Sequence, residues 1–171
     1  MVVENQSSAL STFVTFNVAG RDGGGLYLGG AHQNVVTGTP AAPALLSTNQ
    51  AQRGGGLFVD GSQVRLTYAF LRDNSASAEG GAVYLTGGGA LTSSAGGLPP
   101  TVGGFPVVWF NPAAGGAALH VADGTVVLRS GRIDHYNTSD EVVAAAGDSV
   151  LLFHGVVFDN VVAPVVFEVA D

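Results

Sequence analysis

Three groups of residues in this sequence could bind a ligand or do chemistry, and the first is a row of ring-bearing side chains. Each is the middle residue of an apolar–x–apolar triplet that follows two small residues, as in Gly55-Gly56-Leu57-Phe58-Val59. In a strand, the middle side chain points to the face opposite its two neighbours. If the triplets lie side by side, the row is either a stacking platform for sugar rings or a partner, or an aromatic stack that stabilises the sheet. The middle residues are Tyr27, Phe58, Tyr84 and His120, and Glu168 continues the series.

The second group is a charged cluster near the C-terminus. Hydrolysis of a polysaccharide needs paired carboxylates, and elimination needs a basic residue with acidic calcium ligands. Arg132 and Asp134 are two residues apart and therefore share a strand face. Asp159 is expected one coil further on, near Tyr136. A solvated charged face would have the same composition, so no catalytic residue is assigned. The cluster comprises Arg129, Arg132, Asp134, His135 and Asp159.

The third group is a series of asparagines. An apolar residue stands four positions before each of them, as in Phe70 and Asn74. From the first four asparagines to the next triplet the spacing is 9, 8, 9 and 8 residues. Asn tolerates the left-handed turn conformation, and its amides can form hydrogen-bonded ladders. We therefore expect a structural Asn ladder of Asn17, Asn49, Asn74, Asn111, Asn137 and Asn160.

The overall composition excludes several classes of site and partner. The chain of 171 residues has no Cys, which excludes disulfides and Cys-based zinc sites. His32 and His154 have no partners at metal-ligand spacing, so no metal and no cofactor are expected. The net charge is −7 with six Arg and no Lys, which disfavours nucleic acid as a partner. Gly, Ser, Thr and Pro interrupt every apolar stretch, so no span of about 20 apolar residues could cross a membrane.

The elements that must position these residues come from an internal repeat. After the triplet comes a small or acidic turn and then alternating apolar residues, as in Asp60-Gly61-Ser62-Gln63-Val64-Arg65-Leu66. The Asn-to-Asn intervals are 32, 25, 37, 26 and 23 residues, so the basic unit has 23 to 26 residues. The two longer intervals contain insertions near 29–44 and 86–106, which are expected to be loops because they are rich in Gly, Pro, Ala, Thr or Ser.

Short apolar strands separated by turns, repeating in phase, are typical of a β-solenoid. We predict a single all-β domain over residues 1–171, a right-handed parallel β-helix of about six coils with three short strands per coil. Many of the 26 glycines precede the triplets in phase, where they would allow a sharp corner between sheets.

Asn followed by Gly-Gly-Ala-apolar resembles the repeats of the chlamydial-type polymorphic outer-membrane proteins, which carry F-x-x-N and G-G-A-[I/L/V] motifs. The best match is the stretch from Asn74 to Leu85, and the stretch from Asn17 to Leu28 is similar. Here the Phe stands four residues before Asn rather than three, and other apolar residues replace it in most repeats. The resemblance implies an autotransporter passenger or adhesin-like module at the cell surface or outside the cell.

We therefore expect a non-enzymatic structural or adhesive module that presents a face to a protein partner or a glycan. A carbohydrate-active β-helix and a subunit of a filament or larger assembly are the alternatives. A solenoid exposes its core at an uncapped end, and no capping helix is apparent in the sequence. The chain is therefore expected to be part of a longer solenoid, or to pair its ends with another chain.

Overall fold

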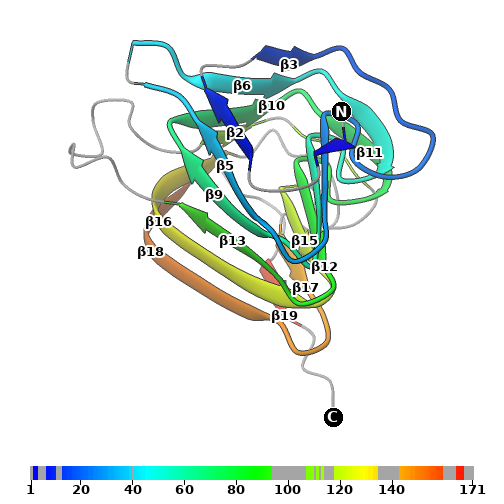
Figure 1. Cartoon of the computed structure of the whole chain (residues 1–171). Helices are drawn as coiled ribbons and strands as arrows, with labels where there is room; N and C mark the ends of the chain where they lie inside the picture. Colours follow the sequence, from blue (N-terminus) through cyan, green and yellow to red (C-terminus); the bar gives the residue numbers. More distant parts are fainter. Residues whose placement is uncertain are drawn as a thin grey trace.

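The computed structural model describes a stack of parallel strands (Figure 1). The described residues are 2–3, 7–10, 13–39, 41–93, 107–109, 111, 113, 118–134, 143–159 and 165–167. The first sheet has seven strands, each pairing in parallel with the strand of the next coil. In spatial order they are β1 (Val2–Val3), β4 (Leu26–Gly29), β8 (Leu57–Asp60), β12 (Val83–Thr86), β15 (Leu119–Val121), β17 (Val143–Ala145) and β19 (Val165–Phe167).

The second sheet has two limbs that join in the later coils. One limb holds β2 (Ser7–Leu10), β5 (Gln33–Thr37), β9 (Gln63–Thr67) and β13 (Gly89–Ser93). The other holds β3 (Phe13–Thr15), β6 (Ala44–Ser47), β10 (Ala69–Arg72) and β14 (Val107–Trp109). Between β9 and β10 the chain bends at Tyr68, whose φ is 48°. Both limbs pair with the long strand β16 (Gly124–Asp134), which pairs in turn with β18 (Val150–Asp159).

A third, two-stranded sheet lies between each asparagine and the following glycines. It consists of β7 (Gln50–Arg53) and β11 (Ser75–Glu79). The repeat pattern predicts glycine corners before the triplets and does not predict these two strands. The strands form because the backbones of adjacent coils run parallel there and can exchange hydrogen bonds, whatever the polarity of their side chains.

The core is a set of apolar rows that run from coil to coil. Strand alternation places the residues on either side of Phe58 inside: Leu57 and Val59 are fully buried. Their register partners Val83 and Leu85 continue the same two rows. Because each coil buries its side chains against the coils before and after it, the stacking supplies the hydrophobic stabilisation.

The predicted fold class is confirmed, with two corrections of detail. All the described elements are strands and the sheets are parallel, as expected of a β-helix. The first sheet has seven strands, where about six coils were expected. The two expected insertions are shorter than predicted, because β5 lies inside 29–44 and β13 lies inside 86–106. The residues around these strands are rich in Gly, which is typical of loops, so the sequence pattern did not predict the strands. Their inward residues include Val36 and Leu91.

Candidate functional site

The glycines before each triplet are required by the stacking of the coils. In three successive coils the first of them has a left-handed φ: 68° at Gly23, 61° at Gly54 and 65° at Gly80. The second glycine of the corner is required for another reason, because there is no room for a side chain at its position. A Cβ on Gly55 would lie 2.4 Å from the Ser75 carbonyl oxygen and 2.6 Å from that of Gly81. The glycines therefore make the corner and also let adjacent backbones approach closely.

At this corner, consecutive N–H groups of one coil all donate to carbonyls of the next coil. The N–H groups of Gly23 and Gly24 donate to the carbonyls of Arg53 and Gly54, at 3.0 and 3.2 Å. One coil later, the N–H of Gly54 donates to the backbone carbonyl of Glu79 at 3.0 Å. The carbonyls at this corner therefore point toward the N-terminal end of the solenoid, and the N–H groups point toward the other end.

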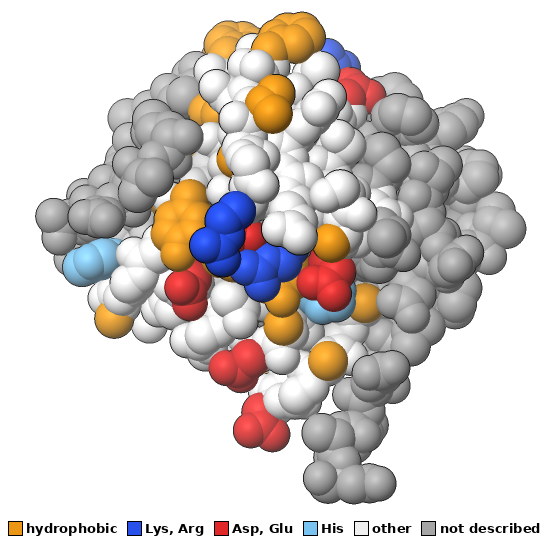
Figure 2. Space-filling model, turned by 90° about the vertical axis from the view of Figure 1, so that its right-hand side faces the viewer, with side chains coloured by type: hydrophobic (Ala, Val, Ile, Leu, Met, Phe, Trp, Pro, Cys, Tyr) orange, Lys and Arg blue, Asp and Glu red, His pale blue; other side chains and the backbone are white. Residues whose placement is uncertain are grey.

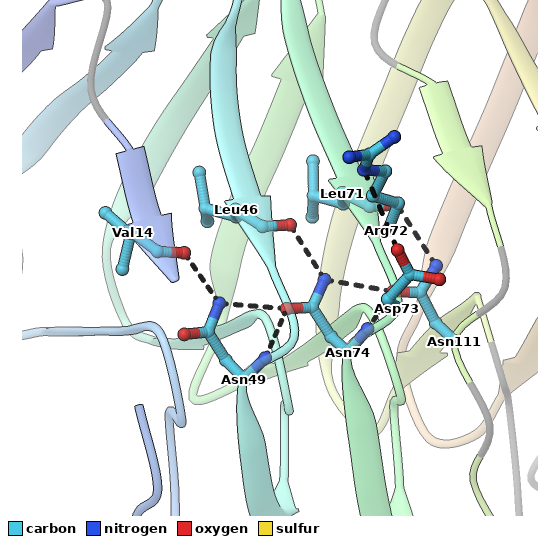
Figure 3. Close-up of polar contacts among 8 residues, drawn as sticks. All are labelled: Val14, Leu46, Asn49, Leu71, Arg72, Asp73, Asn74 and Asn111. Atoms are coloured by element: carbon cyan, nitrogen blue, oxygen red, sulfur yellow. Dashed lines mark hydrogen bonds and ion pairs between the residues drawn. The ribbon is translucent and has the colours of Figure 1, made fainter. Parts of the chain in front are cut away.

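The described asparagines of the predicted ladder are hydrogen-bonded to one another. Figure 3 shows three of them, Asn49, Asn74 and Asn111. The Nδ2 of Asn49 donates to the Oδ1 of Asn74 at 2.9 Å, and that Oδ1 also accepts the backbone N–H of Asn49. Each inner amide makes a further bond to the strand before it: Asn74 donates to the Leu46 carbonyl at 2.9 Å. The ladder joins Asn17, Asn49, Asn74 and Asn111; Asn137 and Asn160 lie outside the described residues.

The expected backbone role of these asparagines is wrong. The left-handed residue is the one before the asparagine: φ is 58° at Phe16, 56° at Thr48 and 55° at Asp73. This turn directs the following side chain inward, and Asn49 and Asn74 are fully buried. Asparagine is therefore required for the donor and acceptor groups of its amide, and not for its tolerance of a positive φ.

The ring-bearing residues form a continuous stack across four coils. Tyr27, Phe58, Tyr84 and His120 are register partners in adjacent strands. Their ring centroids are 5.2, 5.1 and 5.0 Å apart, with interplanar angles of 8°, 7° and 4°. Each inner ring therefore has both faces covered by its neighbours. Phe58 and Tyr84 are only 3% and 6% exposed, so this part of the row is not an open platform for stacking sugars.

An arginine that the repeat pattern does not predict covers the stack. The Arg53 guanidinium carbon lies 5.3 Å from the Phe58 ring centroid and 5.1 Å from that of Tyr84. Its Nε and Nη2 donate to both oxygens of the Asp22 carboxylate, at 2.8 and 2.9 Å. Such a bidentate pair holds the guanidinium against both rings, within the distance at which a cation is attracted to an aromatic ring. Figure 2, which views this side of the molecule, shows basic and acidic side chains close together around hydrophobic ones.

A spacing signal could have identified this pair. Asp22, Arg53 and Glu79 each stand five residues before the middle residue of a triplet. The structure places the three residues in register along the solenoid. The backbone of Asp22 forms a parallel β-bridge with that of Arg53, and Arg53 in β7 is the register partner of Glu79 in β11. When successive repeats carry an anion, a cation and an anion at the same position, the pattern predicts a row of alternating charges along the solenoid. Opposite charges on adjacent strands attract each other in the same way.

The two tyrosines of the stack are held in their neutral form. Burial raises the pKa of the Tyr84 hydroxyl, and the negative charge of Glu79 raises it further. Burial also raises the pKa of the Tyr27 hydroxyl. The negative charge of Asp60 raises it further, and the Asp60 carboxylate accepts a hydrogen bond from the Tyr27 hydroxyl at 3.3 Å. The hydrogen bonds from Arg53 to Asp22 raise the pKa of the guanidinium, which therefore stays charged.

The predicted charged cluster is only partly among the described residues. Asp134 and Asp159 are register partners in β16 and β18, so the expected position of Asp159 near Tyr136 is wrong. The error is one of register, because the two long strands run in parallel for ten residues without a break. Arg129 lies opposite His154 on the same two strands. Arg132 is in β16, while His135 and Glu168 lie outside the described residues.

A buried amide in the core was also missed. Asn34 is 3% exposed and occupies the inward row with Val64 and Leu91. Neither its Nδ2 nor its Oδ1 has a hydrogen-bond partner in the described part of the chain. The sequence gives a signal, because Asn34 stands where this row otherwise holds apolar residues. An unpaired amide at this position lowers stability and does not by itself indicate a ligand.

No protein-family model, curated protein or solved structure matches this chain. The parallel β-helix repeat is therefore established by the structure, while membership of the polymorphic outer-membrane family has no match behind it. Among the described residues, no helix has the length and hydropathy needed to cross a membrane. No group of three or more His, Cys, Asp or Glu in that part of the chain could hold a metal ion.

Proposed function

We propose that this chain is a non-enzymatic structural and adhesive module of a surface or secreted protein, and that it presents the first sheet to a protein partner or a glycan. One observation carries the proposal: the side chains best suited to chemistry hold the coils together. The rings stack on rings, Arg53 binds Asp22, and the asparagines bind one another. This use of polar and aromatic groups favours a rigid scaffold over a catalytic site.

The outer border of the stack is the surface best suited to recognition. The side chain of Arg53 keeps 33% of its surface exposed and that of Asp22 keeps 14%. Tyr27 and His120 are also partly exposed. A ligand at this face would meet ring edges and a charged pair, so a glycan would bind through hydrogen bonds to its hydroxyls more than by stacking. The resemblance to polymorphic outer-membrane repeats supports an adhesin-like role at the cell surface.

A glycan array tests the proposal with two matched variants. Arg53→Gln removes the cation over the rings, and Arg65→Gln removes an exposed arginine from β9, on another face. Both variants change the net charge equally. We expect Arg53→Gln to lose binding and Arg65→Gln to keep it. The reverse pattern would place the binding face elsewhere, and a wild type that binds no glycan would leave only the protein-partner form of the proposal.

A carbohydrate-active β-helix is the second candidate, favoured by the register of Asp134 with Asp159. Adjacent parallel strands lie about 4.8 Å apart. This backbone spacing of the two register partners is of the order of the separation between the paired carboxylates of a retaining glycosidase, about 5 Å. Cleavage of a polysaccharide from a panel, abolished by Asp134→Asn, would support this candidate. Absence of cleavage across the panel would reject it.

A further inference from the structure

The outward face of the second sheet carries basic side chains and, in its described part, no carboxylate. Its exposed basic side chains are Arg65, Arg129 and His154, which strand alternation points toward solvent. Neither arginine forms an ion pair with another described residue. The whole chain has 13 acidic residues and only six Arg, so its composition does not predict such a face. We call it the basic face; it consists of the outward residues of 33–37, 63–67, 90–92, 125–129 and 150–154.

The basic face also has a hollow and exposed apolar side chains. The hollow has a volume of about 280 Å³, is open to solvent and is lined by Gln63, Arg65 and Thr92, among others. Val150 and Leu152 point outward from β18 and are 48% and 56% exposed. Unpaired arginines beside exposed apolar residues are typical of a surface that another protein covers.

A row of aspartates lies at the turn that leads from the first sheet to the second. Asp60, Asp123 and Asp148 occupy this turn in three coils, and none of them forms an ion pair with a described residue. Acidic side chains are visible below the basic ones in Figure 2. The neighbouring residues are small, as Gly61 and Gly147 are, so another surface can approach the carboxylates closely. We call this row the acidic row.

The acidic row and the basic face carry their groups in the same coils. Three coils have an aspartate at the turn and a basic residue on the face: those of β8 and β9, of β15 and β16, and of β17 and β18. The coil of β12 and β13 follows the first of these. It has glycines at its turn and Thr92 on its face, and therefore no charge at either place. The pairs that share a coil are Asp60 with Arg65, Asp123 with Arg129, and Asp148 with His154.

We propose that copies of this chain associate side by side, with their axes parallel and pointing the same way, so that the acidic row of one copy lies on the basic face of the next. In this arrangement all three aspartates meet a basic residue at the same level. Because the intervals between the three coils are unequal, an inverted copy could form two of these pairs and a copy shifted along the axis only one. Complementary charges fix register and orientation in this way.

The contact joins two different surfaces, so it is heterologous. Each copy in a pair still has one of the two surfaces free, and the contact therefore repeats from copy to copy. It does not depend on what the first sheet binds, so its failure and that of the proposed function are separate results.

A charge swap followed by analytical ultracentrifugation tests the contact. We expect the wild type to form concentration-dependent oligomers. Asp123→Arg and Arg129→Asp each replace an attraction by a repulsion, so each alone should weaken association by about tenfold. The double variant Asp123→Arg/Arg129→Asp restores the pair with opposite signs and should associate about as well as the wild type. Arg21→Asp is the control, since Arg21 is exposed outside both surfaces and the change of charge equals that of Arg129→Asp.

Three results would overturn the proposal. The first is a wild type that stays monomeric at every concentration. The second is a swapped double variant that melts like the wild type, by circular dichroism, and does not regain association. The third is rescue of Asp123→Arg by Arg65→Asp and not by Arg129→Asp, which would show that adjacent copies are inverted. If the first swap lowers the melting temperature, the swap of Asp148→Arg with His154→Asp, at two exposed positions, gives the same comparison.

Discussion

Buried amides at two kinds of position have opposite effects on stability. In the ladder, Asn74 binds neighbours through both ends of its amide and so offsets the cost of burial. In the apolar row, Asn34 loses its hydration without gaining a partner. The difference depends on the neighbouring coils, which present asparagines and carbonyls in one row and aliphatic side chains in the other.

Replacing Asn34 by Val should stabilise the protein. The variant removes an unpaired amide and matches Val64 in the same row, so we expect the free energy of unfolding to rise by about 1–2 kcal/mol. The same substitution at Asn49 is the control and should lower it by about 2 kcal/mol or more, because it leaves ladder partners unpaired. Chemical denaturation measures both. Equal effects at the two positions would contradict this account.

Stability should fall as the pH rises above about 10. The pKa of Tyr84 is raised in the folded protein, so the unfolded chain loses its proton at a lower pH than the folded one. Between those two values the unfolded state binds fewer protons, and the free energy of unfolding therefore decreases with pH. Tyr84→Phe should reduce this alkaline slope when melting is followed between pH 8 and pH 11. Tyr68, outside the stack, is the control position for the same substitution.

At the scale of the elements, the glycine corner determines how closely coils can stack. Its hydrogen bonds join consecutive residues of neighbouring coils, a pattern that regular parallel strands do not have. A side chain at the second or third glycine would meet the backbone of the next coil, which cannot move aside without separating the strands on both sides.

The substitution Gly55→Ala should therefore be strongly destabilising, by about 2 kcal/mol or more, because its Cβ would meet two carbonyl oxygens. Gly20→Ala is the matched control. Nothing lies within 4 Å of its added Cβ, and the loss of unfolded-state entropy should leave stability unchanged or slightly higher. Urea midpoints of the two variants give the comparison. If both variants unfold alike, close stacking is not what the glycine provides.

The repeat predicts the fold class and the aromatic and asparagine rows, because each rests on a side chain recurring at fixed spacing. Phe58 aligns with Tyr84 since their triplets occupy one repeat position. Contacts between different repeat positions were not predictable by the same logic. Arg53 covers the stack from another strand, and only the three-dimensional path of the coil brings it there.

The strand β5 was missed for a related reason. Its inward position 34 is Asn instead of an aliphatic residue, which breaks the alternation used to find strands. The register of β18 against β16 was misjudged because their unbroken length differs from that of the shorter earlier strands.

For the molecule as a whole, each coil contacts only the coils before and after it. The free energy of unfolding is therefore the sum of the contributions of the individual coils and of the interfaces between them. The central coils have two such interfaces and the terminal coils have one. We expect amides of β8 and β12 to be the slowest to exchange with solvent, and those of β3 and β18 to be the fastest. Hydrogen exchange followed by mass spectrometry measures this order. Uniform exchange would indicate that the solenoid opens as one cooperative unit.

The glycine corner also has an electrical consequence. In an α-helix, peptide dipoles of about 3.5 D add up because every N–H points one way along the axis. Strands of a sheet lack this property, since their dipoles largely cancel. At the corner of this solenoid, consecutive N–H groups point toward the same end in two successive coils, at Gly23 and Gly24 and again at Gly54 and Gly55. This all-β protein therefore has an axial dipole of the kind associated with helices, with its negative pole at the N-terminal end, and we expect the solenoid to orient along an applied field.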